Sequence, residues 1–168
     1  MKQLKLFESE SEHQDHIHWK LFIDGASRNN PGPSGAGIYI LNDGELFQRD
    51  GYYLGNKTNN QAEYLACLVG LYFIKKSVDF KKPYCISVIS DSQLLVRQLK
   101  GEYRVRNAEL QPLYALAKNW ITEWGAQIFH VLRIENEEAD AMANYGIDKK
   151  KKLPAEFLTI LSQNEITI

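Results

Sequence analysis

The first third of the chain alternates between short apolar runs and polar turns, which is the pattern of β-strands. Strands are expected over residues 19–24, 37–41 and 45–54. Between the second and third strands lies Asn42-Asp43-Gly44, whose residue types favour a tight turn. The pattern therefore predicts a hairpin, and the first strand ends in the carboxylate of Asp24.

Helical spacing replaces this alternation after Thr58. Apolar residues then recur every three to four positions to about Lys76, and Thr58 or Asn59 is suited to cap the helix that this predicts. The later elements expected from the same patterns are strands over 85–91 and 127–132 and helices over 92–99, 107–124 and 135–147. This order predicts an α/β fold: a five-stranded mixed sheet, its first three strands antiparallel, with helices on both faces.

The chain of 168 residues is long enough for one domain with extensions. Residues 1–18 are mostly polar and lack periodicity, so we expect a flexible arm there. The central domain is expected over 19–147. Residues 148–168 form a tail that begins with basic residues, including the run Lys149–Lys152, and continues with an apolar stretch.

Composition narrows the class of protein. The chain has 20 Lys and Arg against 21 Asp and Glu, so a polyanionic partner would have to be bound by a local basic patch. No apolar run approaches the roughly 20 residues of a membrane helix, and we expect a cytoplasmic protein without membrane contact. Cys67 and Cys85 lie in apolar stretches without ligand-like spacing, so both are expected to be reduced and buried.

Four acids lie where side chains of such a fold are expected to meet. Asp24 and Asp91 end apolar strands, Glu63 lies in the first turns of a helix, and Asp140 lies among alanines on the last helix. Ion pairing is the ordinary explanation for a single acid, but no Lys or Arg lies next to Asp24, Glu63 or Asp91. A hard cation such as Mg²⁺ or Mn²⁺ would balance such a cluster, and two ions about 3.5–4 Å apart would suit phosphodiester hydrolysis.

The blocks around these acids resemble type 1 ribonuclease H. They are Asp24-Gly25-Ala26-Ser27-Arg28-Asn29-Asn30-Pro31-Gly32-Pro33-Ser34-Gly35-Ala36-Gly37, Thr58-Asn59-Asn60-Gln61-Ala62-Glu63, Ser90-Asp91-Ser92-Gln93 and Glu135-Asn136-Glu137-Glu138-Ala139-Asp140. All four occur in the family's order within 19–147. The resemblance implies an endonuclease that cuts the RNA strand of RNA/DNA hybrids and leaves 3′-hydroxyl and 5′-phosphate ends.

The resemblance also assigns roles to residues. It implies that Asp24, Glu63, Asp91 and Asp140 are catalytic and bind two Mg²⁺ ions, with Mn²⁺ as an alternative. Asp24 would bridge both ions, Glu63 and Asp91 would complete one site, and Asp140 would hold the other ion. No nucleotide cofactor is expected, and the protein is expected to be a monomer.

Polar residues near the acids are expected to bind the substrate. By resemblance, Asn30, Asn60 and Gln93 contact the minor groove and 2′-hydroxyls, whereas Thr58 and Asn59 contact a DNA phosphate. A helix cap is the plain structural alternative for Thr58 and Asn59, and both roles are compatible. The Gly-rich segment 31–37 lacks the Gly-Lys-Ser/Thr of a phosphate loop, so a tight turn is favoured over a nucleotide site.

The chain departs from the best-known bacterial pattern in two places. His130 stands ten residues before Asp140, as the family's catalytic histidine would, but it lies in a strand pattern, and a structural role is favoured. The shorter loop resembles archaeal and Gram-positive members, in which Arg133 would come nearest the site. The basic protrusion of the best-known bacterial members is also missing. The hybrid would then have to be bound by a patch of Arg97, Lys100, Arg104 and Arg106, with further contacts from the run Lys149–Lys152.

Two other functions fit the same motifs. One is a superfamily member that acts on DNA junctions or free ends, against which the set of Asn30, Asn60 and Gln93 argues. The other is a hybrid-binding module with little activity or one that needs a partner, against which the intact four acids argue.

Overall fold

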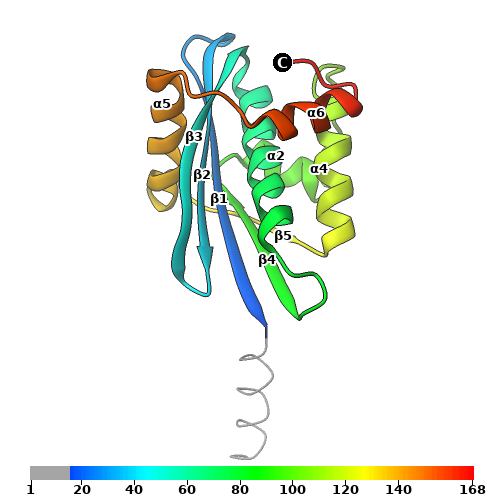
Figure 1. The fold of residues 1–168 in the computed structure, drawn as a ribbon. Helices are drawn as coiled ribbons and strands as arrows, with labels where there is room; N and C mark the ends of the chain where they lie inside the picture. Colours follow the sequence, from blue (N-terminus) through cyan, green and yellow to red (C-terminus); the bar gives the residue numbers. More distant parts are fainter. Residues whose placement is uncertain (1–15) are drawn as a thin grey trace, which may run out of the picture.

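The computed structural model describes residues 16–168 as a five-stranded sheet with helices on both faces (Figure 1). The strands follow the order β3-β2-β1-β4-β5. Pairing is antiparallel between β1 and β2 and between β2 and β3, and parallel from β1 to β4 and from β4 to β5. The predicted mixed sheet is thus confirmed. Its strands are β1 (Ile17–Ser27), β2 (Gly32–Asn42), β3 (Glu45–Lys57), β4 (Tyr84–Ser90) and β5 (Gln127–His130).

Helix α5 covers one face of the sheet, and α2 and α4 lie on the other (Figure 1). Helix α2 is buried along most of its length because the sheet lies on one side of it and α4 and α6 on the other. The helices are α2 (Asn59–Ser77), α3 (Gln93–Leu99), α4 (Gln111–Trp124), the 3₁₀ turn η1 (Arg133–Asn136), α5 (Glu137–Lys149) and α6 (Ala155–Gln163).

Residues 148–168 pack into the same core as the preceding region. Phe157 and Leu161 of α6 are buried, and the Phe157 ring centroid lies 5.4 Å from that of Tyr72 in α2. Ahead of α6, the Tyr53 amide of edge strand β3 donates a hydrogen bond to the Lys151 carbonyl over 2.7 Å. The tail therefore covers α2 and crosses the edge of the sheet.

Several element boundaries differ from those predicted. Helix α4 begins at Gln111, because the Asn107 side chain accepts a hydrogen bond from the Glu109 amide and holds a turn ahead of the helix. Strand β5 ends at His130, because η1 starts three residues later.

Two expectations about individual segments also change. Cys67 is buried as expected, but the prediction that Cys85 is buried was wrong. Strand alternation in β4 turns Ile86 inward and Cys85 outward. Residues 1–15 of the expected arm lie outside the described residues, and Ile17 already belongs to β1. Across residues 16–168, no helix has the length and hydropathy required to cross a bilayer.

Candidate active site

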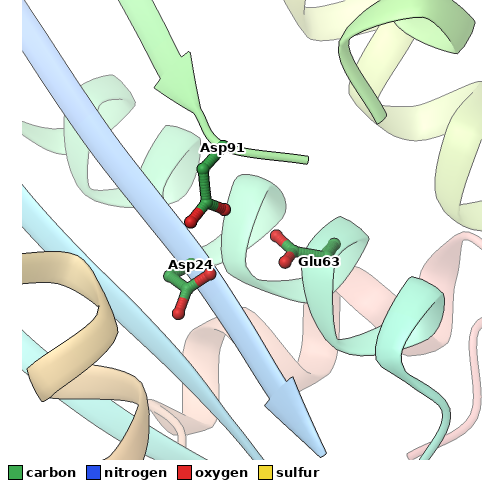
Figure 2. Close-up of side chains that lie close together, drawn as sticks. All are labelled: Asp24, Glu63 and Asp91. Atoms are coloured by element: carbon green, nitrogen blue, oxygen red, sulfur yellow. The ribbon is translucent and has the colours of Figure 1, made fainter. Parts of the chain in front are cut away.

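Three acids from distant parts of the sequence meet at one end of the sheet (Figure 2). Asp24 lies near the end of β1, and Asp91 directly follows β4, its parallel neighbour. Glu63 reaches the same point from the start of α2. One carboxylate oxygen from each residue lies within 4.8 Å of the other two. The carboxyl ends of parallel strands thus place these acids together, as the sequence predicted.

The fourth predicted acid, Asp140, lies on α5 beside Asp24, whose pKa it helps to raise, but outside the group of three whose oxygens converge. All four acids line one open cleft of about 390 Å³, together with Asn59, Asn60 and Arg133 and the serines and backbone of the surrounding loops.

Burial and mutual repulsion shape the electrostatics of this cleft. Asp24 is only 6% exposed, and burial raises its pKa well above the ordinary carboxyl value, with further increases from Glu63, Asp140 and Asp91. Burial is also the largest cause raising the pKa of Glu63, followed by the charge of Asp91. The backbone of Gly25, the side chain of Asp24 and the charge of Arg133, in this order, partly oppose this rise. The site therefore holds more negative charge than its surroundings balance.

The donor set fits a divalent cation. Glu63 Oε2 is buried and has no hydrogen-bond partner within residues 16–168. The converging ligand atoms are all carboxylate oxygens, which Mg²⁺ and Mn²⁺ prefer. Arg133 is the only Lys or Arg lining the cleft in the described chain, and its side chain is largely in solvent. A bound cation would satisfy the Glu63 oxygen and relieve the repulsion.

Of the five predicted substrate-binding residues, Asn59 and Asn60 line the cleft at the start of α2, and Thr58, Asn30 and Gln93 lie outside its lining. Thr58 caps this helix by accepting a hydrogen bond from the Gln61 amide over 3.2 Å. Asn30 Oδ1 accepts from the Asn59 amide over 2.9 Å, and Asn59 Oδ1 accepts from the Ser27 amide over 3.2 Å. These bonds fix the loop after β1 against the helix start.

Asn60 and Gln93 leave their side chains exposed. Asn60 lines the cleft next to Asn59. Gln93 is the first residue of α3, two positions beyond Asp91. Both amides are therefore open to solvent near the acids.

The two accessory candidates are placed differently. Arg133 begins η1, lines the cleft and approaches Asp91. His130 lies at the exposed end of β5, opposite Ser90, and does not line the acidic cleft in the described part of the chain.

Two contacts at the site escaped the sequence analysis. The Gly25 amide donates to Glu63, and the buried Asn136 donates through Nδ2 to the Ile23 carbonyl over 2.8 Å. Both residues lie inside the quoted motifs, but backbone donors and buried amides carry no signal of their own in a sequence.

A five-stranded sheet of this order with four acids at one end defines a ribonuclease H-like fold. The family model described as reverse transcriptase-like matches residues 22–146. "Ribonuclease HI" of Halobacterium salinarum is 37% identical over 131 residues, covering 76% of this chain and 63% of that protein. "Ribonuclease H" of Coxiella burnetii is 34% identical over 151 residues, covering 81% of this chain and 94% of that one.

A solved structure gives the same result. The crystal structure of LC11-RNase H1 in complex with RNA/DNA hybrid is 33% identical with a TM-score of 0.70, and covers 79% of this chain and 97% of that one. The chain belongs to the type 1 ribonuclease H family. The match to this chain spans less than two thirds of the length of the Halobacterium salinarum protein.

Proposed function

We propose that the protein is an endonuclease that hydrolyses the RNA strand of RNA/DNA hybrids and leaves 3′-hydroxyl and 5′-phosphate ends. The observation that carries the proposal is the cleft lined by Asp24, Glu63, Asp91 and Asp140, in which a buried Glu63 oxygen has no hydrogen-bond partner among residues 16–168. The names of the family relatives and the hybrid bound by LC11-RNase H1 support the substrate class.

The four acids would hold two divalent cations, Mg²⁺ or Mn²⁺. Asp24 would serve both cations, Glu63 and Asp91 would help to hold one, and Asp140 would help to hold the other. When bound, such ions supply activation of water and stabilisation of the leaving oxygen. The protein's own contribution is to hold these carboxylates on rigid elements, two strand ends and two helices, before substrate arrives.

Amide side chains would distinguish RNA from DNA. A 2′-hydroxyl both donates and accepts hydrogen bonds, and so does the side chain of Asn or Gln. Asn60 and Gln93 are exposed beside the acids, and Asn30 lies behind Asn59 at the same rim. Thr58 and Asn59 lie at the N-terminus of α2, where the positive end of the helix dipole and the side chains of these two residues favour a phosphate of the DNA strand, although side chains already bind the Thr58, Asn59 and Gln61 amides.

A basic surface next to α3 would extend the binding site. It consists of Arg97, Lys100, Arg104 and Arg106, none of which forms an ion pair among residues 16–168. Arg97 Cζ lies 5.2 Å from the Tyr103 ring centroid. Because α3 begins two residues after Asp91, a duplex seated on the acids would reach this surface and place phosphates against it.

Cleavage of matched duplexes tests the proposal. Labelled RNA/DNA, DNA/DNA and RNA/RNA duplexes of one sequence are incubated with protein and Mg²⁺ or Mn²⁺, and the product ends are mapped. Cleavage confined to the RNA of the hybrid, with 3′-hydroxyl ends, supports the proposal. Cleavage of DNA junctions or ends instead would favour the other superfamily activity. Tight hybrid binding without cleavage in either metal would favour a binding module.

A further inference from the structure

One row of the sheet next to the acids carries a single side chain. Asp24 of β1 pairs with Gly37 of β2, and Gly37 pairs with Gly51 of β3. Paired residues project from the same face of a sheet, and here that face lies under α5. Because Gly37 and Gly51 have no side chains, the backbone of α5 packs directly on the sheet beside the Asp24 side chain.

The approach of α5 to this row requires glycine. A Cβ atom at Gly37 would lie 1.9 Å from the Ala139 carbonyl oxygen and 2.4 Å from the Ala143 amide nitrogen. A Cβ at Gly51 would lie 1.8 Å from the Met142 carbonyl oxygen. Neither glycine has a positive φ, so close packing, and not backbone conformation, is what excludes a side chain there.

A hydrogen bond fixes the same helix from its N-terminal end. Asn136 is 1% exposed, and its Nδ2 donates to the carbonyl of Ile23, the residue before Asp24. Asn136 also precedes Asp140 by four residues, or about one helical turn. The hydrogen bond of Asn136 to β1 and the close packing of Ala139 and Ala143 on Gly37 therefore hold the turn of α5 that carries Asp140.

We propose that Gly37 and Asn136 are positioning residues for the metal-binding pair Asp24 and Asp140. Gly37 sets the height of α5 above the sheet, and Asn136 anchors its start to β1. This inference rests on the proposed function. A methyl group at Gly37 would lie 1.9 Å from the Ala139 carbonyl oxygen, far inside the 3.4 Å at which ordinary contact begins, so this carbonyl would have to move by more than an ångström. Mg²⁺ tolerates much smaller errors in its ligand distances.

The test compares Gly37→Ala and Asn136→Ala, alone and combined with Asp140→Asn. Gly70→Ala is the control, because its Cβ would press on the Leu21 side chain between α2 and β1, a comparable crowding of the core that does not involve α5. Mn²⁺ binding to the substrate-free protein is measured by titration calorimetry, and kcat and KM for a hybrid are measured against Mg²⁺ concentration. Circular dichroism confirms folding.

We expect Gly37→Ala and Asn136→Ala each to weaken Mn²⁺ binding about 10- to 100-fold and to lower kcat with little change in KM. In the Asp140→Asn background neither change should cause further loss, because the pair of carboxylates that it positions is already broken. Gly70→Ala should bind Mn²⁺ like the wild type. If Gly37→Ala does not fold, Asn136→Ala decides the question, since it adds no atoms to the packed interface.

Wild-type Mn²⁺ affinity in both variants, or losses that multiply with that of Asp140→Asn, would overturn the positioning role. Failure of the proposed function looks different: the wild-type protein itself would then neither bind Mn²⁺ nor cleave the hybrid.

Discussion

Arg133 holds its Nε atom 4.0 Å from Oδ2 of Asp91, so that a side chain 91% exposed meets one that is 10% exposed. Such a long and solvated contact adds little to folding stability. Its position at the rim of an acidic cleft is better suited to an incoming phosphate, for which arginine offers several donors.

Replacing Arg133 should therefore lower activity more than stability. We expect Arg133→Ala to reduce kcat/KM about 10- to 100-fold, because a charged donor near the reacting phosphate is lost. The melting temperature should change by less than about 2 °C. His130→Ala is the control, since His130 is exposed and outside the cleft, and it should keep nearly full activity. Steady-state kinetics measure both variants. A larger loss of kcat/KM in His130→Ala than in Arg133→Ala would contradict the assignment of Arg133 to the site and of His130 outside it.

Asp91→Asn should abolish cleavage without unfolding the protein. The amide keeps the shape of the carboxylate but removes a charge needed to hold the cations, so kcat should fall by at least about 1000-fold. Asp148→Asn is a matched control, because Asp148 pairs with Arg28 on the surface outside the cleft. Equal slow rates for wild type and Asp91→Asn would show that the cleft is not catalytic.

The contribution of Asp24 to the stability of the metal-free protein should fall as pH rises. Burial and acidic neighbours raise the pKa of Asp24, so at this site the folded state holds a proton that the unfolded state has lost. This contribution is fully present below the ordinary carboxyl pKa near 4 and declines as pH increases towards the raised value.

Removing this charge should accordingly stabilise the metal-free protein. We expect Asp24→Asn to raise the melting temperature by about 2–8 °C in EDTA at pH 8, with a smaller gain at pH 5. Mg²⁺ should stabilise the wild type more than the variant. Thermal melts at both pH values check this, and a lower melting temperature for Asp24→Asn at pH 8 would argue against repulsion in the cleft.

The basic surface next to α3 should govern affinity and its salt dependence. Arg104→Ala and Arg106→Ala should each weaken binding to a hybrid at low salt and reduce the slope of log K against log salt by about one. Lys82→Ala supplies the control, since Lys82 is exposed in the turn before β4, outside this surface. Fluorescence anisotropy with Asp91→Asn protein separates binding from cleavage. Unchanged salt slopes in both variants would mean that the phosphates of the hybrid bind to another part of the protein.

Loss of the tail's core contact should destabilise the domain. Phe157 is fully buried against Tyr72, so Phe157→Ala should cost about 3–5 kcal/mol of unfolding free energy. The neighbouring Leu158 is 40% exposed, and Leu158→Ala should cost less than about 1 kcal/mol. Urea denaturation measures both, and similar small costs would mean that α6 is not part of the core.

The strands and the acids could be predicted because their signals are local. Asp24 follows an apolar run at strand spacing, and Glu63 lies among alanines at helical spacing, so each position follows from its neighbours. The meeting of these acids follows in turn from the rule that parallel strands end at one edge.

Other features depend on contacts that no short stretch of sequence contains. Packing of α6 on α2 joins residues 72 and 157, and the need for glycine at position 37 depends on the register of three strands and a helix more than 100 residues away. Cys85 was predicted to be buried because its neighbours in the sequence are apolar. It is exposed because its side chain projects from the side of β4 that faces solvent.

The chain segment that crosses β3 affects how the sheet meets other molecules. The two outer strands are β3 and the four-residue β5. Near its end, β3 bonds to Lys151, and near its start it carries Glu45 and Arg49, charged residues that disfavour strand addition. The open part of the edge is thus the first part of β3, where Glu45 and Arg49 flank the exposed Leu46 and Phe47. We expect these charges to keep the protein monodisperse at high concentration, and sedimentation analysis of the wild type checks this.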